Sequence, residues 1–196
     1  MRKRRYRRKR RWPVLLVLVL LAAFGFYTYD RIWPDVEHAI YPKEYRRIVE
    51  EQAKAFDLDE NLVYAMIKAE SDFDANAKSS AGALGLMQMT PGTFEWMQSR
   101  LKETHDTDAL FEPEVSIRYG CALLRLLLNE YDDLTVALAA YNAGMGNVTS
   151  WLSDTAYSAD GVTLQAIPFG ETRIYVQRVL RYKQNYEIIY GGMENG

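Results

Sequence analysis

The feature that most constrains how this chain can fold is an abrupt change, near the N-terminus, from a highly charged segment to an apolar one. Residues 2–11 (RKRRYRRKRR) hold nine Lys and Arg side chains and no acid, and residues 12–29 hold no charged side chain. At about 1.5 Å per residue, a helix over 12–29 would span roughly 27 Å, close to the thickness of a bilayer core. The sequence therefore predicts a basic cytoplasmic tail over 1–11 and a single transmembrane signal-anchor over 12–29.

The flanks of this span predict its orientation. Trp12 at one end and Tyr27 and Tyr29 at the other suit the two aromatic belts of a membrane, and the cationic flank places the N-terminus in the cytoplasm. The rest of the chain is then extracytoplasmic. The alternatives are a cleaved signal peptide, for which Ala23 and Gly25 form a poor cleavage pair, and a buried helix of a soluble protein.

The basic run could also indicate nucleic-acid binding. Its position directly against an apolar span favours a role in topology, supported by anionic lipid. We therefore expect the cytoplasmic membrane as a partner and no nucleic acid.

The rest of the chain has the pattern of an acidic, all-α domain. Residues 12–196 carry 15 basic and 26 acidic side chains, a net charge of −11. Apolar residues recur three and four positions apart from Glu44 onward, while Asp59, Thr90 and Pro113 stand where helices would begin. Sustained alternation of the strand kind is absent from the sequence, so we expect helices throughout.

The same patterns give the expected organisation. Residues 30–43 contain two prolines and no clear periodicity, which predicts a tether. We expect residues 44–190 to form one helical domain, with 153–170 as a loop, and residues 191–196 to form a C-terminal tail. The expected helices run over about 44–56, 60–70, 91–102, 113–128, 133–144, 146–152 and 171–190.

Cysteine and histidine usage excludes several classes of site. Cys121 is the only cysteine, so an internal disulfide and a cysteine-based metal cluster are excluded. The two histidines, His38 and His105, lie far apart in the sequence and in no motif, which weighs against a zinc site or a His-based catalytic triad. We expect neither a metal nor a cofactor.

Glu70 is the candidate catalytic residue. It follows the apolar run AMIKA at the end of an expected helix. A helix C-terminus disfavours negative charge, and burial would raise the pKa of the carboxyl group further. Both effects favour the protonated form that a general acid requires near neutral pH. The alternative is an ordinary solvated glutamate at a helix end.

Four sequence blocks occur around and after Glu70. They are Glu70-Ser71, the run Gly-Leu-Met-Gln at 85–88, Ala-Tyr-Asn at 140–142, and the segment IPFGETRIY at 167–175. In this order and at these separations they resemble the transglycosylase SLT domain of soluble lytic murein transglycosylases, which is related in fold to goose-type lysozyme. The similarity covers about residues 45–190.

The resemblance implies an activity and a mechanism. Family members cleave the β-1,4 bond between N-acetylmuramic acid and N-acetylglucosamine in peptidoglycan glycan strands and leave a 1,6-anhydro end. Glu70 would serve first as general acid and then as base, without the second carboxylate that most glycosidases use. The residues that the resemblance assigns to substrate binding are Ser79, Met87, Gln88, Tyr141, Asn142 and Tyr175.

Alternatives from other classes stay open. A lysozyme on the same fold would hydrolyse the bond with water positioned by Asp72 or Glu171, although Asp72 fits a solvated loop and Glu171 fits an ion pair with Arg173. A peptidoglycan-binding module without activity would not need Glu70. Disruption of membranes by residues 1–29 alone is the third alternative.

Overall fold

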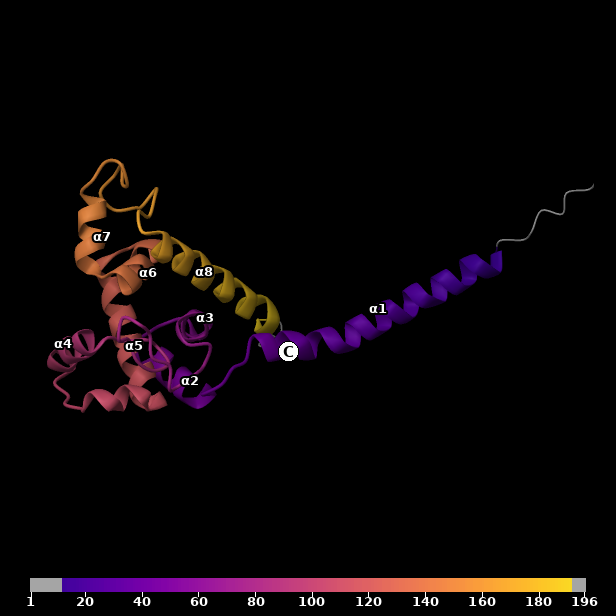
Figure 1. Cartoon of the computed structure of the whole chain (residues 1–196), viewed down its shortest axis with the longest axis horizontal. Helices are drawn as coiled ribbons and strands as arrows, with labels where there is room; N and C mark the ends of the chain where they lie inside the picture. Colours follow the sequence, from indigo (N-terminus) through magenta and orange to yellow (C-terminus); the bar gives the residue numbers. More distant parts are fainter. Residues whose placement is uncertain (1–11, 192–196) are drawn as a thin grey trace, which may run out of the picture. The chain divides into compact units, whose positions relative to one another are not determined.

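The computed structural model describes residues 12–191. They fall into two compact units, and the boundary between the units in the sequence lies between Pro42 and Lys43. The expected basic tail at 1–11 and the C-terminal tail beyond Gly191 lie outside the described residues. The described elements are α1 (Trp12–Ile40), α2 (Arg46–Ala55), α3 (Glu60–Glu70), α4 (Pro91–Leu101), the 3-10 helix η1 (Thr107–Phe111), α5 (Pro113–Glu130), α6 (Leu134–Ala143), α7 (Met145–Leu152) and α8 (Gly170–Tyr190) (Figure 1).

Helix α1 makes up the first unit. Its segment Leu15–Ile40 contains an 18-residue window with a mean hydropathy of 1.6, and the segment is long and apolar enough to cross a membrane. The helix continues through Ile40, so most of the expected tether at 30–43 is helical, although its prolines and lack of periodicity did not predict a helix. Neighbouring turns of the helix support this continuation, since the Trp33 indole donates a hydrogen bond to Glu37 Oε1 at 2.6 Å. As a helix, residues 30–40 extend only about 16 Å.

The second unit is all-helical within the described residues, as expected. Two isolated bridges, Lys78 with Leu84 and Leu84 with Met89, occur in the loop before α4, and strands are absent from residues 12–191. The predicted helix starts at Asp59 and Thr90 are confirmed, because each side chain accepts a hydrogen bond from a backbone N–H of the first turn. Leaving these donors unpaired would destabilise each helix by about 1 kcal/mol.

Helix α5 forms the centre of this unit. It contacts α2, α4, α6 and η1, and α3 packs along α8 (Figure 1). Most of α5 between Ser116 and Leu124 is buried. The packing brings the C-terminal end of α3, the end of α6 and the first turns of α8 to the same region. These three segments carry most of the candidate site residues.

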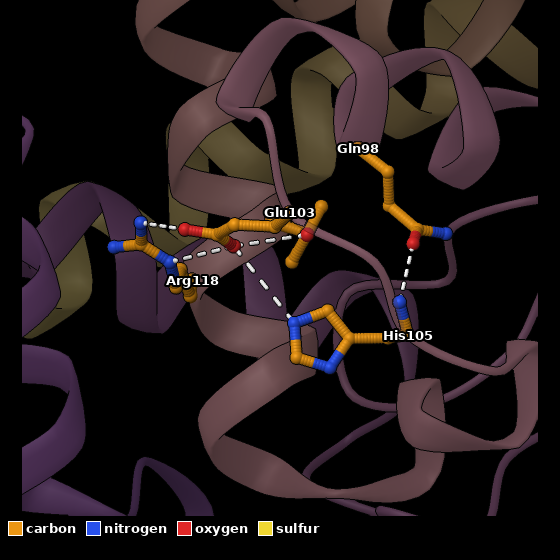
Figure 2. Close-up of polar contacts among 5 residues, drawn as sticks. Gln98, Glu103, His105 and Arg118 are labelled. Carbon is orange, nitrogen blue, oxygen red and sulfur yellow. Dashed lines mark hydrogen bonds and ion pairs between the residues drawn. The ribbon is translucent and has the colours of Figure 1, made fainter.

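A polar cluster fixes the loop between α4 and η1 on α5. The Arg118 guanidinium donates to Glu103 Oε1 at 2.5 Å, and the Tyr119 hydroxyl donates to Glu103 Oε2 at 2.9 Å. On the other side of Glu103 lies His105, whose backbone N–H donates to Gln98 Oε1 at 2.5 Å (Figure 2). The Arg118 ion pair lowers the pKa of Glu103, so the cluster stays charged at neutral pH. It holds α4 against α5.

Candidate active site

Glu70 is the last residue of α3. Residues Leu62–Ile67 of this helix are all buried, while Glu70 itself is half-buried where the helix reaches the surface. Loss of hydration raises the pKa of its carboxyl group from 4.5 to about 7. The Tyr175 hydroxyl and the Arg178 guanidinium oppose this rise, but burial outweighs both. Glu70 is therefore part protonated and part ionised near neutral pH, as its sequence position led us to expect.

Glu70 lies in a cleft that consists of two adjoining hollows. The larger hollow has a volume of about 670 Å³ and runs between the loop before α4, the end of α6 and the start of α8. The smaller has a volume of about 510 Å³ and lies over the end of α3. Glu70, Ser79, Gln88 and Arg178 line both hollows. Volumes of this size are those of ligand-binding clefts, and Glu70 lies at the junction.

The loop between α3 and α4 forms one wall of this cleft. The Ser71 hydroxyl donates to the Leu86 carbonyl at 3.0 Å and so ties the end of α3 to the loop. Gly85 has a φ of +71°, and a Cβ atom there would lie 1.8 Å from the Leu110 carbonyl oxygen. Only glycine allows this close approach. The loop is thereby held as an ordered wall.

Ser79 and Gln88 belong to this wall, and each makes some but not all of the hydrogen bonds that its side chain can form. The Ser79 hydroxyl accepts from the Ala83 N–H at 3.0 Å. Gln88 Nε2 donates to the Ala77 carbonyl at 3.2 Å and to the Gly85 carbonyl at 2.9 Å. Both amide hydrogens of Gln88 are then occupied, and its Oε1 atom can accept from a ligand. The Ser79 hydroxyl hydrogen is available as a donor.

Tyr141 and Asn142 reach the cleft from the end of α6. The Tyr141 hydroxyl donates to the Met87 carbonyl at 2.9 Å, which fixes the ring beside Glu70. Asn142 Oδ1 accepts from the Thr172 hydroxyl at 2.8 Å, and the residue is otherwise exposed. The Asn142 Nδ2 atom therefore remains as a donor toward the larger hollow.

Tyr175 approaches Glu70 from α8. Its hydroxyl is buried and has no full hydrogen bond within the described chain. It nevertheless lies close enough to Glu70 to lower the pKa of that carboxyl group. A buried hydroxyl group without a hydrogen-bond partner destabilises the protein. The Tyr175 hydroxyl is therefore a donor that can bind the Glu70 carboxylate or a ligand in the cleft.

Met87 does not fulfil the expectation that it contacts substrate. Its side chain is fully buried and does not line the cleft. A Cβ atom at Gly120 would lie 2.6 Å from Met87 Cγ, which shows how closely the methionine packs on α5. The expected contact is corrected to a supporting one: the Met87 carbonyl anchors Tyr141, and the side chain anchors the loop in the core.

The other acidic residues near Glu70 are more exposed to solvent than Glu70 is. Asp72 is exposed and pairs with Lys68 at 2.7 Å, which agrees with the expected solvated position. Glu171 lines the larger hollow and is exposed. The expected ion pair between Glu171 and Arg173 is absent from the described salt bridges, in which Glu171 takes no part. Among the described acids that line the cleft, Glu70 is thus the one that is not exposed, and burial raises its pKa.

Arg178 was not among the site residues expected from the sequence. It lines both hollows and acts on the charge of Glu70. Its position one turn after Tyr175 on α8 could have indicated a shared face, because residues three and four apart on a helix are neighbours. Within the described residues, no group of three or more His, Cys, Asp or Glu could hold a metal ion.

Comparison with known proteins identifies the family. Residues 47–161 match the model of the transglycosylase SLT domain. The chain belongs to the transglycosylase SLT domain family. Residues 166–195 match, in addition, the model of the soluble lytic transglycosylase helical domain. The recognition from four short sequence blocks is therefore confirmed.

Relatives of this SLT chain include soluble and membrane-bound enzymes. The soluble lytic murein transglycosylase of Salmonella typhimurium is 32% identical over 84% of this chain and 26% of its own length. The membrane-bound lytic murein transglycosylase C of Haemophilus ducreyi is 27% identical over 81% of this chain and 50% of its own length. The chain thus spans about a quarter of the soluble relative.

Solved structures share the fold. An inactive mutant of lytic transglycosylase Slt from Pseudomonas aeruginosa is 37% identical with a TM-score of 0.68, covering 76% of this chain and 24% of that one. The 70 kDa soluble lytic transglycosylase from Escherichia coli is 26% identical with a TM-score of 0.70, covering 84% and 29%. The described helices therefore have the lytic transglycosylase, lysozyme-like architecture.

Proposed function

We propose that this protein is a membrane-anchored peptidoglycan lytic transglycosylase. Its substrate is the glycan strand, and it cleaves the bond between N-acetylmuramic acid and N-acetylglucosamine. The observation that carries the proposal is the state of Glu70: it lies at the junction of a two-sided cleft with a pKa of about 7. Family membership supplies the substrate class.

Glu70 acts first as a general acid. Its protonated carboxyl group donates to the glycosidic oxygen as the bond from the muramic acid anomeric carbon to that oxygen breaks. A pKa near the working pH gives the residue enough of the protonated form and a good proton donor at the same time. The N-acetyl group of the substrate assists at the anomeric carbon.

Glu70, now ionised, acts next as a base. It removes the proton from the 6-hydroxyl of the same muramic acid, and the 6-oxygen bonds to the anomeric carbon. The proton that Glu70 donated is thereby replaced, and water is not consumed. Tyr175 and Arg178 stabilise the ionised form between the two steps, since both lower the pKa of Glu70.

Ser79, Gln88 and Asn142 bind the sugar in this proposal. The groups that they leave free to bind a ligand complement one another. They are the Ser79 hydroxyl as donor, Gln88 Oε1 as acceptor and Asn142 Nδ2 as donor. Hydroxyl and acetamido groups of a glycan offer both donors and acceptors to such a set. Tyr141 lies beside Glu70 and fixes the loop between α3 and α4 through its hydrogen bond to the Met87 carbonyl.

A hydrolytic lysozyme is the second candidate. The observation that favours it is the freely exposed Glu171, which lines the same hollow as Glu70 and could position a water molecule. Against it stands the exposure of Glu171 itself, because a carboxylate in contact with bulk solvent holds no single water in place. We therefore prefer the reaction with one glutamate.

Helix α1 anchors the enzyme in the cytoplasmic membrane in this proposal, as a single pass. The nine cations before it keep the N-terminus in the cytoplasm and place the catalytic unit outside. Names of membrane-bound relatives support an association with the membrane. The alternative is a protein released by cleavage of the N-terminal helix, which would be found in the medium with an N-terminus beyond residue 25.

The proposed function is tested by the products formed from purified peptidoglycan. The detergent-solubilised full chain and its Glu70→Gln variant are incubated with sacculi, and released muropeptides are identified by mass spectrometry. We expect anhydromuramic products from the wild type and none from the variant. Cleavage that survives the substitution would refute the role of Glu70, and reducing-end products would favour the lysozyme.

A further inference from the structure

Ser116 on α5 is a buried polar residue that the proposed reaction does not use. Its side chain is 1% exposed and lies in a stretch of helix that packs mostly apolar residues into the core. A hydroxyl group buried in such surroundings destabilises a protein unless it makes a hydrogen bond. The partner of Ser116 therefore indicates what the residue does.

The partner lies in the loop that forms one wall of the cleft. Ser116 Oγ accepts a hydrogen bond from the Met87 N–H at 3.1 Å. One turn later on α5, Gly120 leaves the space in which the Met87 side chain packs. Residues four apart share a helix face. This face of α5 thus provides Met87 with both a hydrogen-bond acceptor and a packing site.

The main chain of Met87 connects Ser116 to Tyr141. Its N–H donates to Ser116, and its carbonyl accepts from the Tyr141 hydroxyl on α6 at 2.9 Å. Tyr141 and Glu70 line the same hollow, and the charge of Glu70 acts on the Tyr141 hydroxyl. The two hydrogen bonds therefore connect the core of α5 to the surroundings of Glu70. Ser116 itself lines neither hollow of the cleft.

Gln88 is held independently of this connection. Its Nε2 atom donates to the Ala77 and Gly85 carbonyls, both of which belong to the same loop. The amide that we propose as a sugar ligand therefore keeps these hydrogen bonds when the Ser116 hydroxyl is removed. A change at Ser116 should accordingly affect the group beside Glu70 more than it affects sugar binding.

We propose that Ser116 is a positioning residue for the cleavage reaction, because it fixes the Met87 peptide, which in turn holds Tyr141 in place beside Glu70. The inference rests on the proposed function. Without the Ser116 hydroxyl, the Met87 N–H is unpaired in the core, so the peptide shifts toward another partner and the carbonyl that holds Tyr141 shifts with it. A small displacement next to a reacting group slows the chemical step.

The test compares two buried serines. Ser116→Ala removes the acceptor of the Met87 N–H. The matched control is Ser158→Ala, because Ser158 is 2% exposed and its hydroxyl accepts from the Gly161 N–H at 3.0 Å, in the loop before α8 and outside both hollows of the cleft. Each substitution deletes one hydroxyl and leaves one backbone N–H without its acceptor. Each should lower the urea midpoint of the full chain by about 0.5–1 M.

The readout is kcat and KM for cleavage of soluble glycan strands by the full chain in detergent, for each variant alone and combined with Tyr141→Phe. Ser116→Ala should lower kcat about tenfold and leave KM within about twofold of wild type. In the Tyr141→Phe background it should lower kcat less than about twofold, because the connection to the Met87 carbonyl is already broken. Ser158→Ala should change kcat less than about twofold in both backgrounds.

Three results would overturn the inference. They are equal losses of kcat in Ser116→Ala and Ser158→Ala, a tenfold loss from Ser116→Ala in both backgrounds, and a raised KM with an unchanged kcat. In each case cleavage by the wild type leaves the proposed function intact. If the wild type forms no product, the proposed function fails. The urea midpoints then decide whether the connection exists, since additive shifts for Ser116→Ala and Tyr141→Phe would refute it.

Discussion

Replacement of Glu70 by glutamine should stabilise the protein in a pH-dependent way. The folded state raises the pKa of Glu70 from 4.5 to about 7, so folding favours the protonated form. Stability from this group is fully present below about pH 4.5 and is lost as the pH rises through about 7. Each pH unit in that window corresponds to about 1.4 kcal/mol, so ionised Glu70 destabilises the fold by about 3 kcal/mol.

Glutamine has nearly the same shape and stays neutral, which makes Glu70→Gln the matched probe. We expect the variant to exceed wild type in free energy of unfolding by about 3 kcal/mol at pH 8.5 and by less than about 0.5 kcal/mol at pH 4.5. Chemical denaturation of both full chains in one detergent, across this range, measures the difference.

The control is Glu95→Gln, on the exposed face of α4. An exposed carboxylate keeps its hydration on folding, so this substitution should give no pH-dependent difference. A gain in stability for Glu70→Gln that is the same at pH 4.5 and pH 8.5 would refute the reasoning, because a desolvated carboxylate must lose its penalty when protonated.

Three further predictions follow from the site. The initial rate of glycan cleavage should fall as the pH rises above about 7, where Glu70 loses its proton, and a rate that keeps rising to pH 9 would contradict its role as acid. Gly85→Ala should lower the free energy of unfolding by at least about 3 kcal/mol in urea titrations, because its Cβ would overlap the Leu110 carbonyl and its φ is positive; a loss below 1 kcal/mol would mean that the loop moves freely. Tyr141→Phe removes the hydrogen bond to the Met87 carbonyl and should lower stability by about 1–2 kcal/mol and slow cleavage, whereas unchanged values of both would show that this anchor is dispensable.

The helices could be predicted from the sequence where local chemistry decides them. Asp59 and Thr90 cap helices by their own side chains, so their positions are readable without tertiary contacts. The sequence did not predict that α1 continues through residues 30–40, because prolines ordinarily mark irregular chain and the contact of Trp33 with Glu37 is visible only in the structure. The 3-10 helix Thr107–Phe111 had no periodic signal, since it is a single short turn.

The sequence predicted the site residues that lie in recognisable motifs, but not the directions of their side chains. The position of Glu70 after an apolar helix made it a candidate, and the resemblance to the SLT domain implied its catalytic role. The resemblance also implied Ser79, Gln88, Tyr141, Asn142 and Tyr175, which all line the larger hollow. The direction of the Met87 side chain could not be predicted, because it depends on the space left by Gly120 on another helix.

Arg178 shows the other limit of sequence reasoning. Its effect on Glu70 arises from the packing of α8 along α3, which brings together residues more than 100 positions apart. A charged residue on a helix ordinarily faces solvent, so the helical spacing from Tyr175 alone did not show that Arg178 reaches the cleft.

The most direct test of the central claim is cleavage of peptidoglycan by the full chain in water enriched in oxygen-18. If Glu70 closes the 1,6-anhydro ring by taking the proton of the 6-hydroxyl, the released muropeptides contain no labelled oxygen and are lighter than hydrolysis products by one water molecule. Incorporation of one labelled oxygen at each new muramic acid end would show that water attacks the anomeric carbon, and would contradict the reaction with one glutamate.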